Sequence, residues 1–180
     1  MRPLAPEVAE LVTGKTVVLD TNAFVEGYSN PQEFSSLLGG LAGLDCALTT
    51  IEAIRIEFLS KNRSVDELTK KINFYNQALT YPELPNATFA IELKEPSLLF
   101  AFGCQAHNFK AVDFMLAAVL KKYAANTLLL TNDHHDFTPA LFTLATLLPL
   151  LPEAGGVIPF GLYSFSEEKY AQILTKNAKP

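Results

Sequence analysis

The chain has 180 residues, of which 49% are hydrophobic and 18% are charged, and it contains 13 phenylalanines. This length and composition predict one domain with a large core and exclude a disordered or low-complexity chain. Two cysteines are too few for a disulfide framework or a cysteine-ligated zinc site, which favours a reducing, cytoplasmic location. The formal net charge of −5 argues against a non-specific nucleic-acid binder, because such proteins usually carry a basic surface.

We expect neither a signal peptide nor a membrane span in this sequence. The first 15 residues include Glu7 and Glu10 and lack an apolar stretch, so no signal peptide is expected. The longest apolar run, 137–152, contains three prolines and is too short for a membrane span. We expect a single domain over 1–180, with a core at about 16–162 and extensions at 1–15 and 163–180.

Short apolar runs alternate with helical patterns along the chain, which predicts an α/β fold. Strands are expected at about 16–20, 45–49, 87–91, 126–131 and 157–162. Helices are expected at about 30–40, from 49 onward, and at 64–79, 96–106, 110–124, 138–148 and from 166 onward. Together they predict a mostly parallel five-stranded sheet with helices on both faces, in three layers. Ligands of such folds lie beyond the carboxyl ends of the strands.

Several helix ends are marked by local residue patterns. Asn30-Pro31 reads as a cap followed by proline at the first helical position, and Gly39-Gly40 is expected to end that helix. The segments 49–52 and 64–67 both have the form of a capping box, in which two side chains satisfy free backbone donors.

Three aspartates fall where an α/β site is expected. Asp20 ends the first strand, Asp133 follows the strand at 126–131, and Asp113 lies beside the apolar stripe of the helix at 110–124. Converging carboxylates repel one another unless a hard cation such as Mg²⁺ or Mn²⁺ binds between them. Each residue also has a structural alternative: Asp20 can cap a turn, Asp113 can stabilise a helix N-terminus, and Asp133 can form a turn.

The order of these motifs resembles the PIN-domain nuclease family. The matching pieces are Val17-Val-Leu-Asp20-Thr-Asn22, a later helical Glu, Ala111-Val-Asp113-Phe, and Thr131-Asn-Asp133-His-His-Asp136-Phe137. They span about 16–160. The resemblance implies a PIN-like fold and an endoribonuclease with Mg²⁺ or Mn²⁺ as cofactor, whose catalytic and metal-binding residues are Asp20, Glu57, Asp113 and Asp133. It also implies an RNA substrate, a toxin that a small antitoxin protein inhibits, and a homodimer.

The second acidic residue has two candidates, because Glu52 and Glu57 lie on one expected helix about 140° apart. Glu57 better matches the family's Glu followed by an apolar pair, and Glu52 has a structural role in the expected capping box. Supporting roles, as further ligands or as groups that orient carboxylates, fall to four more residues: Asn22, Thr131, Asn132 and Asp136.

Other readings stay open at this point. The chain can be a non-catalytic PIN-like module that binds RNA or protein, which the geometry of the carboxylates would reveal. A phosphatase with Asp20 as nucleophile lacks its usual second acid, because position 22 is Asn. His134 and His135 are expected in an exposed loop, since no cysteine is near enough for a zinc site.

The net charge takes on another meaning if the carboxylates share metal. Two divalent ions would neutralise four carboxylates, which brings −5 to about −1. We then expect the protein to bind RNA phosphates through weak, local contacts rather than through a broad basic surface. Two groups of cations are candidates for these contacts: Lys61, Arg63, Lys70 and Lys71, and Lys110, Lys121 and Lys122.

Overall fold

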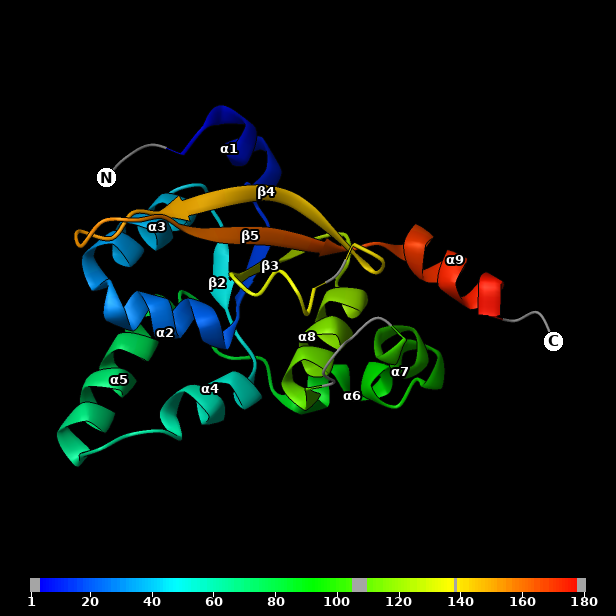
Figure 1. Ribbon diagram of the computed structural model, residues 1–180, viewed down its shortest axis with the longest axis horizontal. Coiled ribbons are helices and arrows are strands. Elements are labelled where there is room, and N and C mark those ends of the chain that lie inside the picture. Colours follow the sequence, from blue (N-terminus) through cyan, green and yellow to red (C-terminus); the bar gives the residue numbers. More distant parts are fainter. Residues whose placement is uncertain (1–3, 105–109, 138, 178–180) are drawn as a thin grey trace.

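A five-stranded sheet forms the centre of the computed structural model, which describes residues 4–104, 110–137 and 139–177 (Figure 1). The strand order is β2-β1-β3-β5-β4. The strands are β1 (Thr16–Leu19), β2 (Ala47–Thr49), β3 (Thr127–Thr131), β4 (Phe142–Leu150) and β5 (Ile158–Phe165). β2, β1 and β3 are parallel, whereas β5 is antiparallel to β3 and to β4. The α/β fold and the five-stranded sheet are confirmed, and its parallel part is the half made of β2, β1 and β3.

Helices occupy most of the remaining chain and pack beside the sheet (Figure 1). They are α1 (Pro6–Val12), α2 (Thr21–Ser29), α3 (Pro31–Ala42), α4 (Glu52–Leu59), α5 (Val65–Ala78), the 3₁₀ helix η1 (Asn86–Phe89), α6 (Ala90–Leu93), α7 (Pro96–Gly103), α8 (Ala111–Lys122) and α9 (Glu167–Asn177). α2 and α8 both contact β3, so these two helices flank the strand that ends near the expected site. None of the described helices is long and apolar enough to cross a membrane.

Local sequence signals predicted several elements correctly. β1, β2, β3 and β5, and the helices α3, α5, α7, α8 and α9, occur close to their expected positions, although the expected end of α7 at 105–106 lies outside the described residues. Pro31 begins α3, and the Ser64 hydroxyl accepts a hydrogen bond from the Glu67 backbone N–H at 3.1 Å. The Glu67 carboxylate accepts a hydrogen bond from the Arg63 N–H at 2.8 Å instead of from the N–H of the cap residue, so only half of that capping box forms.

Three expectations about secondary structure are wrong, and one helix was not expected. The 87–91 segment is helical, with η1 leading into α6, and α3 continues through Gly39-Gly40 to Ala42. The run after Pro139, expected as a helix, forms β4 because it pairs with β5 along its length (position 138 itself lies outside the described residues). α2 was not expected, although Asp20 is its N-cap. In each case tertiary packing outweighs local preference.

The capping box expected at 49–52 does not form. The Thr49 hydroxyl donates to the Pro82 carbonyl at 2.6 Å, and the Thr50 hydroxyl donates to the Leu19 carbonyl at 2.7 Å. α4 therefore begins at Glu52 with no side-chain cap. Both hydroxyls instead join the end of β2 to neighbouring segments, because a buried hydroxyl needs a partner wherever one is available.

The core is aromatic and includes both terminal segments. Ten of the described phenylalanines are buried, which agrees with the large core expected from the composition: Phe24, Phe34, Phe58, Phe89, Phe102, Phe114, Phe137, Phe142, Phe160 and Phe165. Val8 and Val12 of α1 and Tyr170 and Ile173 of α9 belong to the same buried cluster. These helices thus pack on the domain that the central sheet organises.

Candidate active site

Asp20 lies where the two central parallel strands end. β1 and β3 pair with Leu19 opposite Leu130, so the residues that follow each strand meet at one edge of the sheet. Asp20 is 3% exposed, and its Oδ2 accepts a hydrogen bond from the Thr131 hydroxyl at 2.6 Å. Its Oδ1 accepts from the Thr21 backbone N–H at 2.6 Å, which caps α2. The carboxylate is therefore fixed by both a strand and a helix.

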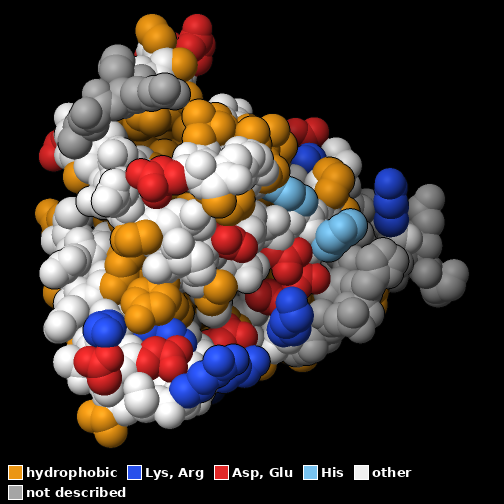
Figure 2. All heavy atoms as spheres, turned by 60° about the vertical axis from the view of Figure 1, so that its left-hand side comes forward, with side chains coloured by type: hydrophobic (Ala, Val, Ile, Leu, Met, Phe, Trp, Pro, Cys, Tyr) orange, Lys and Arg blue, Asp and Glu red, His pale blue; other side chains and the backbone are white. Residues whose placement is uncertain are grey.

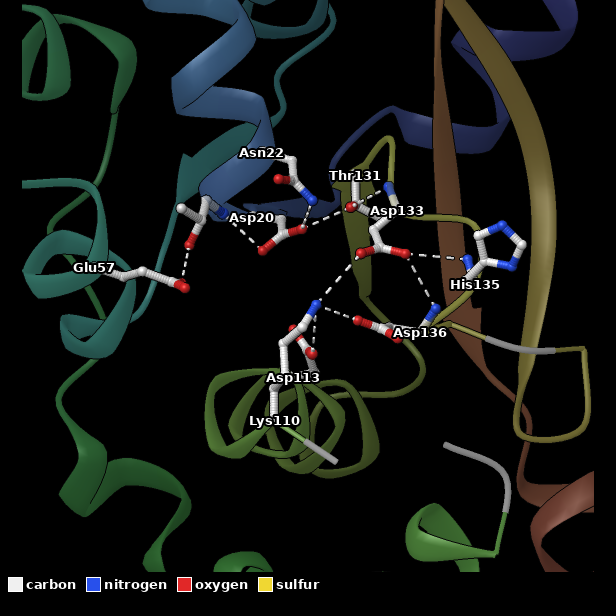
Figure 3. Close-up of polar contacts among 10 residues, drawn as sticks. Asp20, Asn22, Glu57, Lys110, Asp113, Thr131, Asp133, His135 and Asp136 are labelled. Carbon is white, nitrogen blue, oxygen red and sulfur yellow. Dashed lines mark hydrogen bonds and ion pairs between the residues drawn. The ribbon is translucent and has the colours of Figure 1, made fainter. Parts of the chain in front are cut away.

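Asp133 is held beside Asp20 by a turn after β3. The Thr131 hydroxyl accepts a hydrogen bond from the Asp133 backbone N–H at 3.0 Å, so one hydroxyl connects both aspartates. The Asp133 Oδ1 accepts from the N–H groups of His135 at 3.1 Å and Asp136 at 3.2 Å. The expected turn role of Asp133 thus coexists with a place in the acidic cluster, because Oδ2 faces Lys110 (Figure 3).

Asp113 enters the cluster from the first turn of α8. It is 8% exposed, and its Oδ2 is buried without a hydrogen-bond partner among the described residues. The ammonium of Lys110 lies 3.7 Å from this oxygen, 3.6 Å from Asp133 Oδ2 and 2.6 Å from Asp136 Oδ2 (Figure 3). The Lys110 ammonium and a hydrogen bond with the Asp136 side chain therefore balance part of the cost of burying the Asp113 carboxyl group.

Of the two candidate glutamates, only Glu57 faces this region. Its Oε2 accepts a hydrogen bond from the Thr21 hydroxyl at 2.5 Å, and Figure 3 shows its side chain pointing toward Asp20. Glu52 points elsewhere, since its carboxylate accepts from the Asn86 backbone N–H at 3.0 Å and so holds the start of η1.

Burial and mutual repulsion raise the pKa values of two aspartates. Burial raises the pKa of Asp20 to about 6, although the hydrogen bonds from Thr131 and Thr21 oppose this, and the nearby charge of Glu57 adds to it. Burial and the neighbouring charge of Asp20 raise the pKa of Asp113 to about 8. Without a cation, the site therefore cannot easily hold every carboxylate in its charged form.

The Lys110 ammonium supplies part of the missing positive charge. The hydrogen bond to Asp136 raises the pKa of Lys110 above its usual range. Burial works to raise the pKa of Asp136, but the hydrogen bonds with Lys110, Asp113 and Asp133 and the Lys110 charge together outweigh it, so the pKa falls below its usual value. Asp136 is thus the Lys110 partner, and the longer contacts leave Asp113 and Asp133 incompletely neutralised.

The remaining expected residues lie at the border of the cluster. The Asn22 amide is 3.4 Å from Asp20 Oδ2, at the limit of a hydrogen bond, and Asn132 is half-buried. His134 contacts the Tyr163 hydroxyl at 2.5 Å and the Pro159 carbonyl at 3.0 Å, so its ring joins the β3–β4 connection to β5. His135 is exposed, as expected, whereas the expected exposure of His134 is wrong, since its ring is half-buried against β5. The third histidine, His107, lies outside the described residues.

The donor set suits Mg²⁺ or Mn²⁺, since every candidate ligand is a carboxylate and one buried oxygen has no hydrogen bond. Within the described ranges, no three acidic, histidine or cysteine side chains are close enough to enclose an ion as they stand. Lys110 is the cation that lies among Asp113, Asp133 and Asp136. A metal ion would fit this oxygen set only after Lys110 moves away.

Two residues that contact the acidic cluster, Lys110 and Thr21, were not predicted as site residues from the sequence. Lys110 was grouped with Lys121 and Lys122 as a surface cation, although its position three residues before Asp113 places it one helical turn away. Thr21 was read only as part of the Asp-Thr-Asn motif, and its bond to Glu57 depends on how α2 meets α4.

Comparisons with family models, curated proteins and solved structures found no match for this chain.

Proposed function

We propose that the protein is a metal-dependent ribonuclease of PIN-like architecture that hydrolyses RNA phosphodiester bonds. The observation that carries the proposal is the gathering of Asp20, Asp113 and Asp133 at the end of the two central strands, where the buried Asp113 Oδ2 has the Lys110 ammonium as its ion-pair partner at 3.7 Å. Carboxylates that are buried close together repel one another and gain free energy from a bound cation. Mg²⁺ or Mn²⁺, when bound, supplies an activated water and stabilises the leaving oxygen.

Some residues of the site would bind the metal, and others orient the metal-binding carboxylates. Asp20, Asp113 and Asp133 would bind the metal, with Glu57 at the edge of the site where it can hold a second ion or a metal-bound water. The Thr131 hydroxyl fixes Asp20 and Asp133 relative to each other. Thr21 orients Glu57 through its hydrogen bond, and Asp136 holds the Lys110 ammonium next to the acidic cluster.

The wider assignment follows from the same proposal. A three-layer arrangement with helices on both faces, a cytoplasmic location, a homodimer and a role as toxin with an antitoxin partner all belong to the PIN-like interpretation. Their support is the order of the motifs along 16–160 together with the sheet order that brings Asp20 and Asp133 to one edge.

An RNA-cleavage assay with Mn²⁺ or Mg²⁺ tests the proposal. Asp20→Asn and Asp113→Asn should each lower the cleavage rate at least a hundredfold, because each removes a charge that binds the metal, whereas the exposed Asp66→Asn in α5 should leave it unchanged. Equal activity in all four proteins would point to a contaminating nuclease and refute the proposal.

The same assay separates the two glutamates. Glu57→Gln should reduce cleavage with little change in stability, because Glu57 faces Asp20. Glu52→Gln should lower the stability instead, since it weakens the bond to the Asn86 N–H. The opposite pattern would place Glu52 in the site.

A non-catalytic module that binds RNA or protein is the second candidate. It is favoured by Lys110, whose ammonium already balances part of the acidic cluster, and by the lack of a preassembled metal cage among the described residues. RNA binding without metal-dependent cleavage in the wild-type protein would support this candidate over the nuclease.

A further inference from the structure

A basic hollow lies beside the C-terminal ends of α2 and α4, the two helices that carry Thr21 and Glu57. Its volume is about 690 Å³, and its walls are formed by Tyr28 of α2, by Lys61, Asn62 and Arg63 between α4 and α5, and by Glu67 of α5. On the face drawn in Figure 2, Lys and Arg side chains lie on the same side of the molecule as the acidic patch. This hollow has no role in the site described above.

Helix geometry places the hollow in line with the acidic site. Tyr28 follows Thr21 by seven residues, which is about 20° short of two full turns and roughly 10 Å along the axis. Lys61 follows Glu57 by four residues and lies two residues past the end of α4. The Thr21–Glu57 hydrogen bond and the contact of the Tyr28 and Phe58 rings, whose centroids are 6.2 Å apart, join both ends of α2 to the last turn of α4, so the site and the hollow border the same pair of helices.

The loop that carries the two cations is fixed through its backbone. The Lys71 ammonium donates to the Lys61 carbonyl at 2.7 Å, and the Arg63 N–H donates to the Glu67 carboxylate at 2.8 Å. The Asn62 amide donates to the Leu59 carbonyl at 2.5 Å. These bonds use main-chain atoms of Lys61 and Arg63 and leave their exposed side chains available to a ligand.

The charge of the hollow suits an anionic chain. Its lining contains two positive charges, on Lys61 and Arg63, and one carboxylate, on Glu67, which also pairs with the Lys71 ammonium at 3.5 Å. Among the described residues, neither the Lys61 ammonium nor the Arg63 guanidinium makes an ion pair or a hydrogen bond, although Glu67 lies near Arg63. Free cations beside an aromatic ring are the pattern with which proteins bind single-stranded nucleic acids.

We infer that this hollow binds the phosphate backbone of a single-stranded RNA, away from the cleavage point, through Lys61 and Arg63. The inference rests on the proposed function, because the acidic site fixes where the strand is cut and α2 and α4 give the direction in which it continues. An acidic protein segment is the competing ligand.

Equilibrium binding of a labelled single-stranded RNA tests the inference, with EDTA present so that nothing is cleaved. The oligonucleotide has about 12 nucleotides, a length that covers both the site and the hollow. The variant Lys61→Gln/Arg63→Gln is compared with Lys94→Gln/Lys176→Gln, which removes two exposed cations elsewhere. Both variants change the net charge from −5 to −7, so non-specific repulsion is matched.

The loss of two phosphate contacts should lower the slope of log K against log salt by about 1.4. Between about 50 and 200 mM salt, the wild-type protein should therefore lose roughly sevenfold more affinity than the hollow variant. The control variant should keep the wild-type slope. A hollow variant with the slope of the control, or a wild-type protein that binds no RNA at the low salt concentration, would overturn the inference.

Two further readouts keep the inference separate from the proposed function. If the wild-type protein binds oligoglutamate through Lys61 and Arg63 but not RNA, the hollow takes an acidic protein segment and the inference is wrong. If Asp20→Asn still cleaves RNA while the hollow variant shows the reduced slope, the inference holds and the assignment of the acidic site fails.

Discussion

The variant Lys110→Gln tests whether the Lys110 ammonium and a metal ion compete for the same position in the acidic site. The ammonium lies 2.6, 3.6 and 3.7 Å from three aspartate oxygens, and a divalent ion has to displace it. In a water-like dielectric each of these contacts is worth about 1 kcal/mol or somewhat more. The Lys110 side chain is 54% exposed, so screening reduces the total to about 1–2 kcal/mol.

We therefore expect Lys110→Gln to bind Mn²⁺ about tenfold more tightly than the wild-type protein, since 1.4 kcal/mol corresponds to a factor of ten. Isothermal titration calorimetry at constant pH and salt measures the affinity directly. Lys94→Gln serves as the control because it removes an equal charge from an exposed position on α6's C-terminal side.

The metal-free variant should show the opposite effect on stability. Without Lys110, the carboxylates of Asp113, Asp133 and Asp136 lose their shared cation, so the free energy of unfolding should fall by about 1–2 kcal/mol and recover with saturating Mn²⁺. An unchanged or weaker Mn²⁺ affinity in Lys110→Gln, relative to Lys94→Gln, would refute the view that ammonium and metal compete for one position.

Three further outcomes follow from the structure. The folded-state pKa values of Asp20 and Asp113 are raised to about 6 and about 8, so the folded protein binds more protons than the unfolded chain between roughly pH 4 and 8. The metal-free protein should therefore become less stable as pH rises through that window. Chemical denaturation measures this dependence, and Asp113→Asn should make the stability change less with pH. Thr131→Val should cost about 1–3 kcal/mol because it leaves buried partners of the hydroxyl unpaired, whereas Thr131→Ser should restore most of the loss; equal stability of the two variants would contradict the bridging role. Gly27→Ala should lower the melting temperature by several degrees, because a Cβ at this position would overlap the buried Phe34 ring, and an unchanged melting temperature would show that α2 and α3 separate easily.

The strands and helices that local patterns define were predictable from the sequence. β1 and β3 are apolar and rich in branched side chains, and α8 shows helical spacing, so these elements hold Asp20, Asp113 and Asp133 near the places expected for them. Parallel pairing of β1 with β3 then brings the carboxylates to one edge of the sheet, which the sequence order of strands and helices already indicated.

The elements that depend on distant partners were not predictable in the same way. The 139–150 segment is long and apolar, and only its pairing with β5 makes it a strand rather than a helix. Thr49 and Thr50 match a capping box in the sequence, but their hydroxyls find buried carbonyls of Pro82 and Leu19 that no local pattern reveals.

The same limit applies to the candidate site. The choice between Glu52 and Glu57 depends on which neighbour each carboxylate meets, Asn86 or Thr21, and both neighbours come from other helices. The position of Lys110 among three aspartates depends on how the start of α8 faces the turn after β3. Spacing along the chain identifies candidates, and packing decides their contacts.

The most direct test of the central claim is to locate Mn²⁺ by anomalous X-ray diffraction from crystals grown at neutral pH. The account requires a peak within coordination distance of Asp20, Asp113 and Asp133, with the Lys110 ammonium displaced from its present position. A peak elsewhere, or none while Lys110 stays bonded to Asp136 at saturating Mn²⁺, would contradict the assignment of this cluster as a metal-dependent active site.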